Sequence, residues 1–275
     1  MGKYIRIIVP IAVIIISFYI HPLLGTAVIL VSIGLLFYFN RYQVYALKGR
    51  QYYANNDMEK AIIYFRKAMS AKKPSPDIVI SYGYLLLKNG DPDNAEKVID
   101  NLINRKDTPD DKKEIARALK ALIIWKKGDI DKAIETLEDV LKKVETTNIY
   151  GSLGYLYILK GDLDKALEYN LKAYEYNNSN AVIVDNLGQT YYLRKEYDKA
   201  AELYEKLMNK EPKPNFPEAY YNYGLVLLET KGRDEAVKYI EKALTYKFTY
   251  LSTVSREQME KTLEEIKKGD DSSNA

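Results

Sequence analysis

The chain has 275 residues, 47% hydrophobic and 29% charged, which is enough for one large domain or two smaller ones. It has no cysteine and only one histidine, so the sequence excludes disulfides, thiolate nucleophiles, histidine-based catalysis and multi-histidine metal sites. Lys3, Arg6 and Arg41 account for the net charge of +3, because 38 basic residues balance 38 acidic ones from Tyr42 onward. A neutral body lacks the basic face that nucleic-acid binding requires.

The first forty residues contain no acidic residue and are almost entirely apolar. A single helix of that length would rise about 50 Å, well beyond the ~30 Å hydrocarbon core of a bilayer. Pro22 interrupts the run, since proline disfavours helix at the residue before it. We therefore expect residues 1–41 to form a transmembrane hairpin, with spans over about 4–20 and 23–40.

Basic residues flank this apolar stretch, with Lys3 and Arg6 before it and Arg41, Lys48 and Arg50 after it. The positive-inside rule then places both ends in the cytoplasm and predicts a multi-pass protein of the cell membrane. Two alternatives fit the same residues: a cleaved signal peptide, or one span followed by an interfacial helix. The single histidine is expected to be a turn residue at the membrane interface.

No proline occurs between Leu23 and Ala54. We therefore expect the second span to run straight into the first helix of the domain that follows, as a rod of ~48 Å at 1.5 Å per residue. Such a rod would mount that domain rigidly at the membrane, with Gly49 as a packing residue rather than a joint.

From Tyr42 to Tyr250 the sequence repeats a small residue, an apolar residue three positions later, a turn, and then an alanine. The small residues Gly49 and Gly83 are 34 residues apart. Six repeats share this pattern, over about 42–75, 76–109, 114–146, 147–180, 181–214 and 217–250. A period of this length predicts stacked helix pairs.

Each repeat is interpreted as two antiparallel helices joined by a turn, often at Asn-Asp or Gly-Asp. The small residue on the first helix and the alanine on the second allow the backbones to approach closely. An aspartate before the second helix can accept hydrogen bonds from its free N–H groups, at Asp57, Asp91, Asp129 and Asp162. No repeat can bury its apolar face alone, so we expect the repeats to stack into a solenoid.

This pattern resembles the tetratricopeptide repeat family, whose 34-residue unit places Leu-Gly, Tyr, Ala and Pro at fixed offsets. The matching residues are Leu153-Gly154, Tyr157 and Ala166, and then Leu187-Gly188, Tyr191, Ala200 and Pro212. The resemblance implies an all-α protein with a right-handed α-solenoid that binds proteins or peptides in a concave groove. Asn170 departs from the family pattern, which has an aromatic residue there, and the third repeat lacks the glycine and the tyrosine.

After the sixth repeat, residues 251–268 carry an apolar stripe and are expected to form a capping helix. Residues 269–275 are predicted to be a disordered tail. The sequence contains no phosphate-binding loop, dinucleotide glycine pattern, zinc signature or nucleophile elbow. We therefore expect no enzymatic activity, cofactor or metal.

The family resemblance implies that the first helix of each repeat lines the groove. Tyrosine and tryptophan there would give large, rigid contact area with one polar tip. In the family, asparagines two residues before the small glycine often hold the backbone of an extended peptide, which singles out Asn186 and Asn222. The opposite interpretation is that these side chains pack between neighbouring helices. The candidate ligand-binding residues are Arg50, Tyr53, Tyr84, Lys88, Trp125, Asn148, Ser152, Tyr155, Asp185, Asn186, Gln189, Tyr192, Tyr221 and Asn222.

Taken together, these features predict a membrane-anchored scaffold that binds a peptide segment or a partner protein in the groove. Such a scaffold would assemble or recruit a membrane-associated complex. The alternative is an architectural subunit or homo-oligomer that uses the hairpin and the convex surface and has no groove ligand. The identity of the partner is not predicted.

Overall fold

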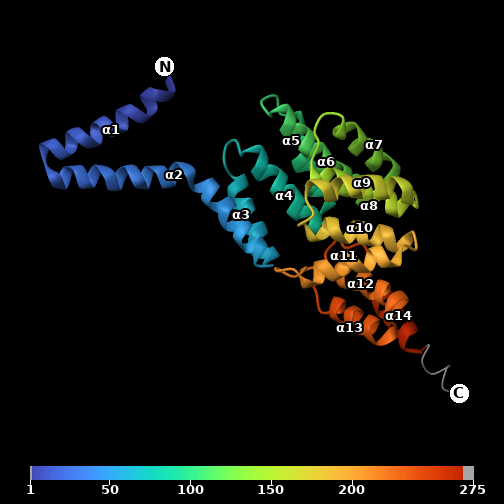
Figure 1. Cartoon of the computed structure of the whole chain (residues 1–275). Coiled ribbons are helices and arrows are strands. Elements are labelled where there is room, and N and C mark those ends of the chain that lie inside the picture. The colour runs from blue at the N-terminus through green and yellow to red at the C-terminus, as the bar shows by residue number, and fades with distance from the viewer. Residues whose placement is uncertain (1, 269–275) are drawn as a thin grey trace. The chain divides into compact units, whose positions relative to one another are not determined.

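The computed structural model describes residues 2–268, and for residues 2–10 and 39 it describes the backbone alone. The predicted tail, residues 269–275, therefore lies outside the described residues. The described part of the chain contains helices and no strands (Figure 1). The chain divides into two compact parts, residues 1–78 and 79–275, each described by itself.

The N-terminal part contains α1 (Gly2–Ile20), α2 (Pro22–Ala54) and α3 (Met58–Met69). Helices α1 and α2 form a hairpin, drawn in blue in Figure 1. His21 is the turn residue, as predicted, and its Nδ1 accepts a hydrogen bond from the N–H of Leu23 at 3.2 Å. This side chain caps α2, whose first residue is a proline that needs no such partner.

The hairpin is tight because the helices meet at a glycine. A Cβ atom at Gly25 would lie 2.3 Å from the ring of Phe18, so only glycine fits this ring against α2. No single described helix is both long and apolar enough to cross a membrane. Two segments of α2, Pro22–Tyr38 and Asn40–Ala54, pass that test of length and composition only together. The two predicted spans thus stay a prediction.

The expected straight rod is wrong, because α2 bends by 61° between its two segments. The Asn40 amide donates to the Leu36 carbonyl at 2.9 Å, and the Arg41 guanidinium donates to the Tyr38 carbonyl at 2.8 Å. Side chains that bond to carbonyls of the preceding turn compete with the helical hydrogen bonds and bend the helix. The helix is continuous in sequence, but it changes direction where its polar residues begin.

The C-terminal part consists of consecutive helix pairs and a final helix (Figure 1). The pairs follow the predicted second to sixth repeats, and α14 packs on α13 but begins at Arg256, five residues after the predicted start of the capping helix at residue 251. The helices are α4 (Pro76–Lys88), α5 (Pro92–Asn104), α6 (Asp110–Lys126), α7 (Ile130–Leu141), α8 (Thr147–Lys160), α9 (Leu163–Tyr176), α10 (Ala181–Leu193), α11 (Tyr197–Asn209), α12 (Pro217–Thr230), α13 (Arg233–Leu244) and α14 (Arg256–Lys268).

The predicted close approach of the two helices in a pair is confirmed. A Cβ atom added at the small glycine would lie 2.1–2.8 Å from a side chain of the second helix, always the one 16 residues later. In the third repeat the small residue is Ala121, which lies in the same buried hydrophobic cluster as Leu137. The glycine pairs are Gly49–Phe65, Gly83–Ile99, Gly154–Asn170, Gly188–Tyr204 and Gly224–Ile240.

The predicted helix caps are also confirmed. The four aspartates accept a hydrogen bond from the backbone N–H three residues later, at 2.9–3.3 Å. The preceding turn residue has a positive φ, for example 86° at Gly90 and 81° at Gly161, a conformation that favours glycine. These local signals fix where each second helix begins.

We predict that Gly188→Ala destabilises the protein by about 1–3 kcal/mol. The new Cβ atom would lie 2.6 Å from the ring of Tyr204, a fully buried side chain that cannot move aside. Urea denaturation of the full chain in mild detergent measures the effect. The control is Val182→Ala, an exposed position on the same helix, which should change stability by less than ~0.5 kcal/mol.

Candidate functional site

The predicted ligand-binding residues lie on the first helices of the repeats. Arg50 and Tyr53 lie near the end of α2, in the N-terminal part. The other twelve lie in the C-terminal part: Tyr84 and Lys88 on α4, Trp125 on α6, Asn148, Ser152 and Tyr155 on α8, Asp185, Asn186, Gln189 and Tyr192 on α10, and Tyr221 and Asn222 on α12. Their exposure differs widely, since Asn148 is exposed whereas Asp185 is buried.

Asp185 is the centre of a buried polar network that joins three helices. Its Oδ1 accepts hydrogen bonds from the Tyr204 hydroxyl at 2.8 Å and from the Asn222 amide at 3.0 Å. Burial raises the pKa of the Asp185 carboxyl to about 7, and the nearby Glu218 acts in the same direction. The two hydrogen bonds act against this rise but do not cancel it, because desolvation of a charged carboxylate is the larger effect.

The two asparagines at equivalent positions both bond to the preceding repeat. The Asn186 amide donates to the Gly151 carbonyl at 3.0 Å, and the Asn222 amide donates to Asp185. Both side chains are buried. Packing between repeats therefore uses these amide groups, which favours the packing interpretation, and their predicted contact with a peptide stays a prediction.

Aromatic side chains of α6 and α8 come together as the sequence suggested. The rings of Trp125 and Tyr155 meet edge to face, with centroids 5.6 Å apart. The Lys126 ammonium lies 4.7 Å from the Trp125 ring centroid. Burial raises the pKa of the Tyr155 phenol and lowers that of the Lys126 ammonium, so this cluster is partly shielded from water.

A segment that was not predicted as part of the site lies on these helices. The C-terminal loop, Thr245–Ser255, connects α13 to α14. Its Tyr250 donates from N–H to the Lys88 carbonyl at 3.1 Å and from O–H to the Lys126 carbonyl at 3.2 Å. Tyr250 and Lys126, which form the second bond, are 124 positions apart in the sequence.

The same loop also contacts α8 and α12. The N–H of Thr253 donates to the Glu218 carboxylate at 2.9 Å, and Thr253 partly offsets the rise in the pKa of the Tyr155 phenol that burial causes. No local signal in the sequence marks these contacts, because the partners lie in other repeats. The only hint is that the connection carries three aromatic residues, Tyr246, Phe248 and Tyr250.

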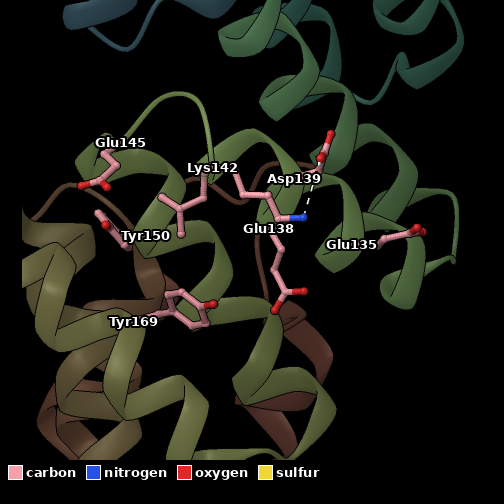
Figure 2. Close-up of a pocket in the computed structure, with 8 residues that line it drawn as sticks. Glu135, Glu138, Asp139, Lys142, Glu145, Tyr150 and Tyr169 are labelled. Atoms are coloured by element: carbon pink, nitrogen blue, oxygen red, sulfur yellow. Dashed lines mark ion pairs between the residues drawn. The ribbon is translucent and has the colours of Figure 1, made fainter.

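A separate pocket of about 510 Å³ lies among α7, α8 and α9 (Figure 2). None of the predicted residues lines it. Glu138 accepts a hydrogen bond from the Tyr157 hydroxyl at 2.6 Å, and Asp139 pairs with Arg117 at 2.5 Å, so these carboxylates already have partners. The lining residues are Glu135, Glu138, Asp139, Leu141, Lys142, Glu145, Tyr150 and Tyr169.

Comparison with known families decides the classification. Models of the tetratricopeptide repeat match residues 42–74, 82–143, 119–181, 184–218 and 217–250. The chain belongs to the tetratricopeptide repeat family. Tetratricopeptide repeat proteins generally mediate protein–protein interactions, and the fold is typically a scaffold without enzymatic activity.

Named relatives support the same classification. The TPR repeat-containing protein MJ1428 of Methanocaldococcus jannaschii is 25% identical over 251 residues, which are 82% of this chain and 44% of that protein. The chain thus spans less than half the length of this relative. Among solved structures, the APC/C hetero-tetramer Cut9–Hcn1 has a TM-score of 0.60 at 18% identity, over 74% of this chain and 40% of that one. Pseudomonas aeruginosa pilF has a TM-score of 0.54 at 16% identity, over 81% and 97%. These two structures share the fold.

We predict that the stability of Asp185→Asn relative to wild type is greater at pH 7.5 than at pH 4.5 in this tetratricopeptide repeat protein. Because the folded-state pKa is raised, folding favours the protonated carboxyl, and this stability is lost as pH rises from about 4 to about 7. The amide cannot ionise and keeps an oxygen for Tyr204 and Asn222. Urea denaturation at both pH values measures how much unfolding free energy each protein loses between pH 4.5 and pH 7.5. This loss should be smaller in the variant than in wild type, by on the order of 3 kcal/mol.

The control is Asp139→Asn, because the ion pair with Arg117 lowers the pKa of that exposed carboxyl. This variant should bring no gain at pH 7.5. An Asp185→Asn variant with the full wild-type pH dependence would contradict the prediction.

Proposed function

We propose that the protein is a membrane-anchored scaffold that binds a segment of a partner protein on the first helices of its repeats. It would assemble or recruit a membrane-associated complex. The observation that carries the membrane part is the apolar surface of α1 and of the first segment of α2. The protein-binding part rests on membership of a family that generally mediates protein–protein interactions.

Large apolar side chains are exposed along this hairpin. Tyr19 is 94% exposed, Leu23 is 74% exposed, and Ile16, Leu30 and Phe37 are each more than half exposed. Monomeric soluble proteins rarely expose a continuous apolar surface larger than a few hundred Å². A lipid bilayer would cover this surface without a specific partner. The basic residues at both ends of the stretch favour a cell-membrane protein with its repeats in the cytoplasm.

The binding surface includes the cluster of Trp125, Lys126 and Tyr155. Its rings offer rigid apolar area, and the ammonium and the hydroxyl offer polar contacts. One observation favours the second candidate, an architectural subunit or homo-oligomer without a groove ligand. Asn186 and Asn222 already bond to neighbouring repeats, so these two amides have fewer groups left for a peptide.

We predict that Ile16→Lys combined with Leu30→Lys releases the protein from membranes. Each lysine in the hydrocarbon core costs about 2.5–3.5 kcal/mol. Wild type should stay in the pellet after alkaline extraction of membranes, whereas the variant should move to the supernatant. The control is Ile63→Lys, an exposed apolar position on α3 that should leave the protein in the pellet. Extraction of wild type would contradict membrane anchoring.

We also predict that Trp125→Ala combined with Tyr155→Ala removes the partner from complexes purified in mild detergent. Truncating an aromatic at the centre of an interface typically costs 2 kcal/mol or more, roughly a 30-fold loss of affinity. Quantitative mass spectrometry of the co-purified proteins measures this loss. The control is Leu171→Ala on α9, which lies on a second helix. Retention of every partner would favour the architectural candidate.

A further inference from the structure

The C-terminal loop makes contacts that repeat stacking does not require. In a solenoid each repeat normally touches only its neighbours. Here the connection after the sixth repeat reaches the ends of α4 and α6, in the second and third repeats. Such a placement needs specific chemistry at the point of contact.

Tyr250 supplies that chemistry. Lys88 and Lys126 are the last residues of α4 and α6, where helix carbonyls lack partners within the helix. The residue four positions after Lys88 is Pro92, which has no N–H to offer. The tyrosine N–H bonds to the first carbonyl and its O–H to the second. The Lys126 ammonium also lies 4.8 Å from the centroid of its ring.

The second anchor of the loop is a buried carboxylate. Glu218 is only 7% exposed, and it accepts the N–H of Thr253 at 2.9 Å. A buried carboxylate needs hydrogen-bond donors to offset its desolvation. Two titratable groups interact electrostatically with Glu218, namely the Lys126 ammonium, which attracts it, and the Asp185 carboxyl.

The tip of the loop is a turn that is stabilised by hydrogen bonds between its own residues. The Ser252 N–H donates to the Thr249 carbonyl at 2.9 Å, and the Thr249 N–H donates to the Ser252 hydroxyl at 3.1 Å. Tyr250 lies inside this turn and keeps 37% of its surface exposed. A competing segment can therefore reach the tyrosine position from solvent.

We propose that Lys88, Lys126, Tyr155 and Glu218, termed the loop seat, form a recognition site for a tyrosine-bearing turn of a partner protein. The protein's own C-terminal loop fills this seat until such a segment displaces it. The partner segment must present a tyrosine and, three residues later, a free backbone N–H for Glu218. This inference rests on the proposed function, since it names the surface and the kind of segment bound there.

The loop is tethered at both ends, so its effective concentration at the seat is on the order of millimolar or higher. A free peptide of the same sequence should therefore bind poorly to wild type and well to a variant with a released loop. The probe is a fluorescent peptide with the sequence of residues 245–255. The variant is the full chain with Tyr250→Ala, and the matched control is Tyr250→Phe, which keeps the ring over Lys126.

We expect fluorescence anisotropy to show saturable binding of the peptide to the Tyr250→Ala protein, at least tenfold tighter than to wild type. The Tyr250→Phe protein should lie between the two, because it loses only the hydrogen bond to Lys126. Adding Glu218→Gln to the Tyr250→Ala protein should weaken peptide binding several-fold. Binding that is equal in wild type and Tyr250→Ala, or absent from both, would overturn the proposal.

A reversible lock gives a second test, since the chain contains no cysteine. A Cβ atom at Gly90 would lie 3.9 Å from the Cβ of Tyr250, within the 3.5–4.5 Å range of disulfides. In the protein with Gly90→Cys and Tyr250→Cys, oxidation should prevent peptide binding and reduction should restore it. Equal binding in both states would show that the loop does not block the seat.

Gly90 has a φ of 86°, so cysteine there is strained, and circular dichroism of the reduced protein must first confirm its fold. Light scattering that shows wild type to be a dimer with exchanged loops would also overturn the proposal that the loop binds within its own chain. The peptide assay uses purified components and is independent of partner purification. Its failure alone leaves the proposed scaffold standing, whereas retention of every partner by Trp125→Ala with Tyr155→Ala counts against both the groove and the seat, because Tyr155 belongs to the seat.

Discussion

The close contact between the two helices of each repeat is the constraint on which the rest of the structure depends. At the glycine of the first helix, in every repeat except the third, there is no room for a Cβ atom, because a side chain of the second helix fills that space. This contact fixes the separation of the two helices and the turn between them. It also determines which face of the first helix is left for neighbouring repeats and for ligands.

The fourth repeat shows how strictly the contact must be filled. Asn170 replaces the usual aromatic residue, yet it is fully buried and lies against Gly154. Its amide donates to the Thr190 hydroxyl at 2.9 Å, while its Oδ1 has no hydrogen-bond partner. A buried acceptor without a donor costs about 1–3 kcal/mol, so the repeat keeps its geometry at some loss of stability. Asn170 is thus a core residue, although it departs from the family pattern.

The first helices combine two roles that compete for the same side chains. Asp185, Asn186 and Asn222 hold adjacent repeats together, and their polar groups are committed to that task. Trp125 and Tyr155 instead pack against each other beside Lys126, which already binds Tyr250 of the protein itself. The surface that the family uses for recognition is therefore divided between packing and a contact that a partner would have to replace.

The sequence by itself determined the helix pairs, their caps and turns, and the small residue that packs against the side chain 16 positions later. These features depend on interactions within one repeat, so a single periodic sequence encodes them. Only the tertiary structure decided three other features: the 61° bend of α2, the pairing of Asn186 with Gly151, and the seat of Tyr250 on Lys88 and Lys126. The bend depends on which carbonyl a polar side chain reaches. The other two join residues that are 35 or more positions apart, and no local pattern specifies which distant groups will meet.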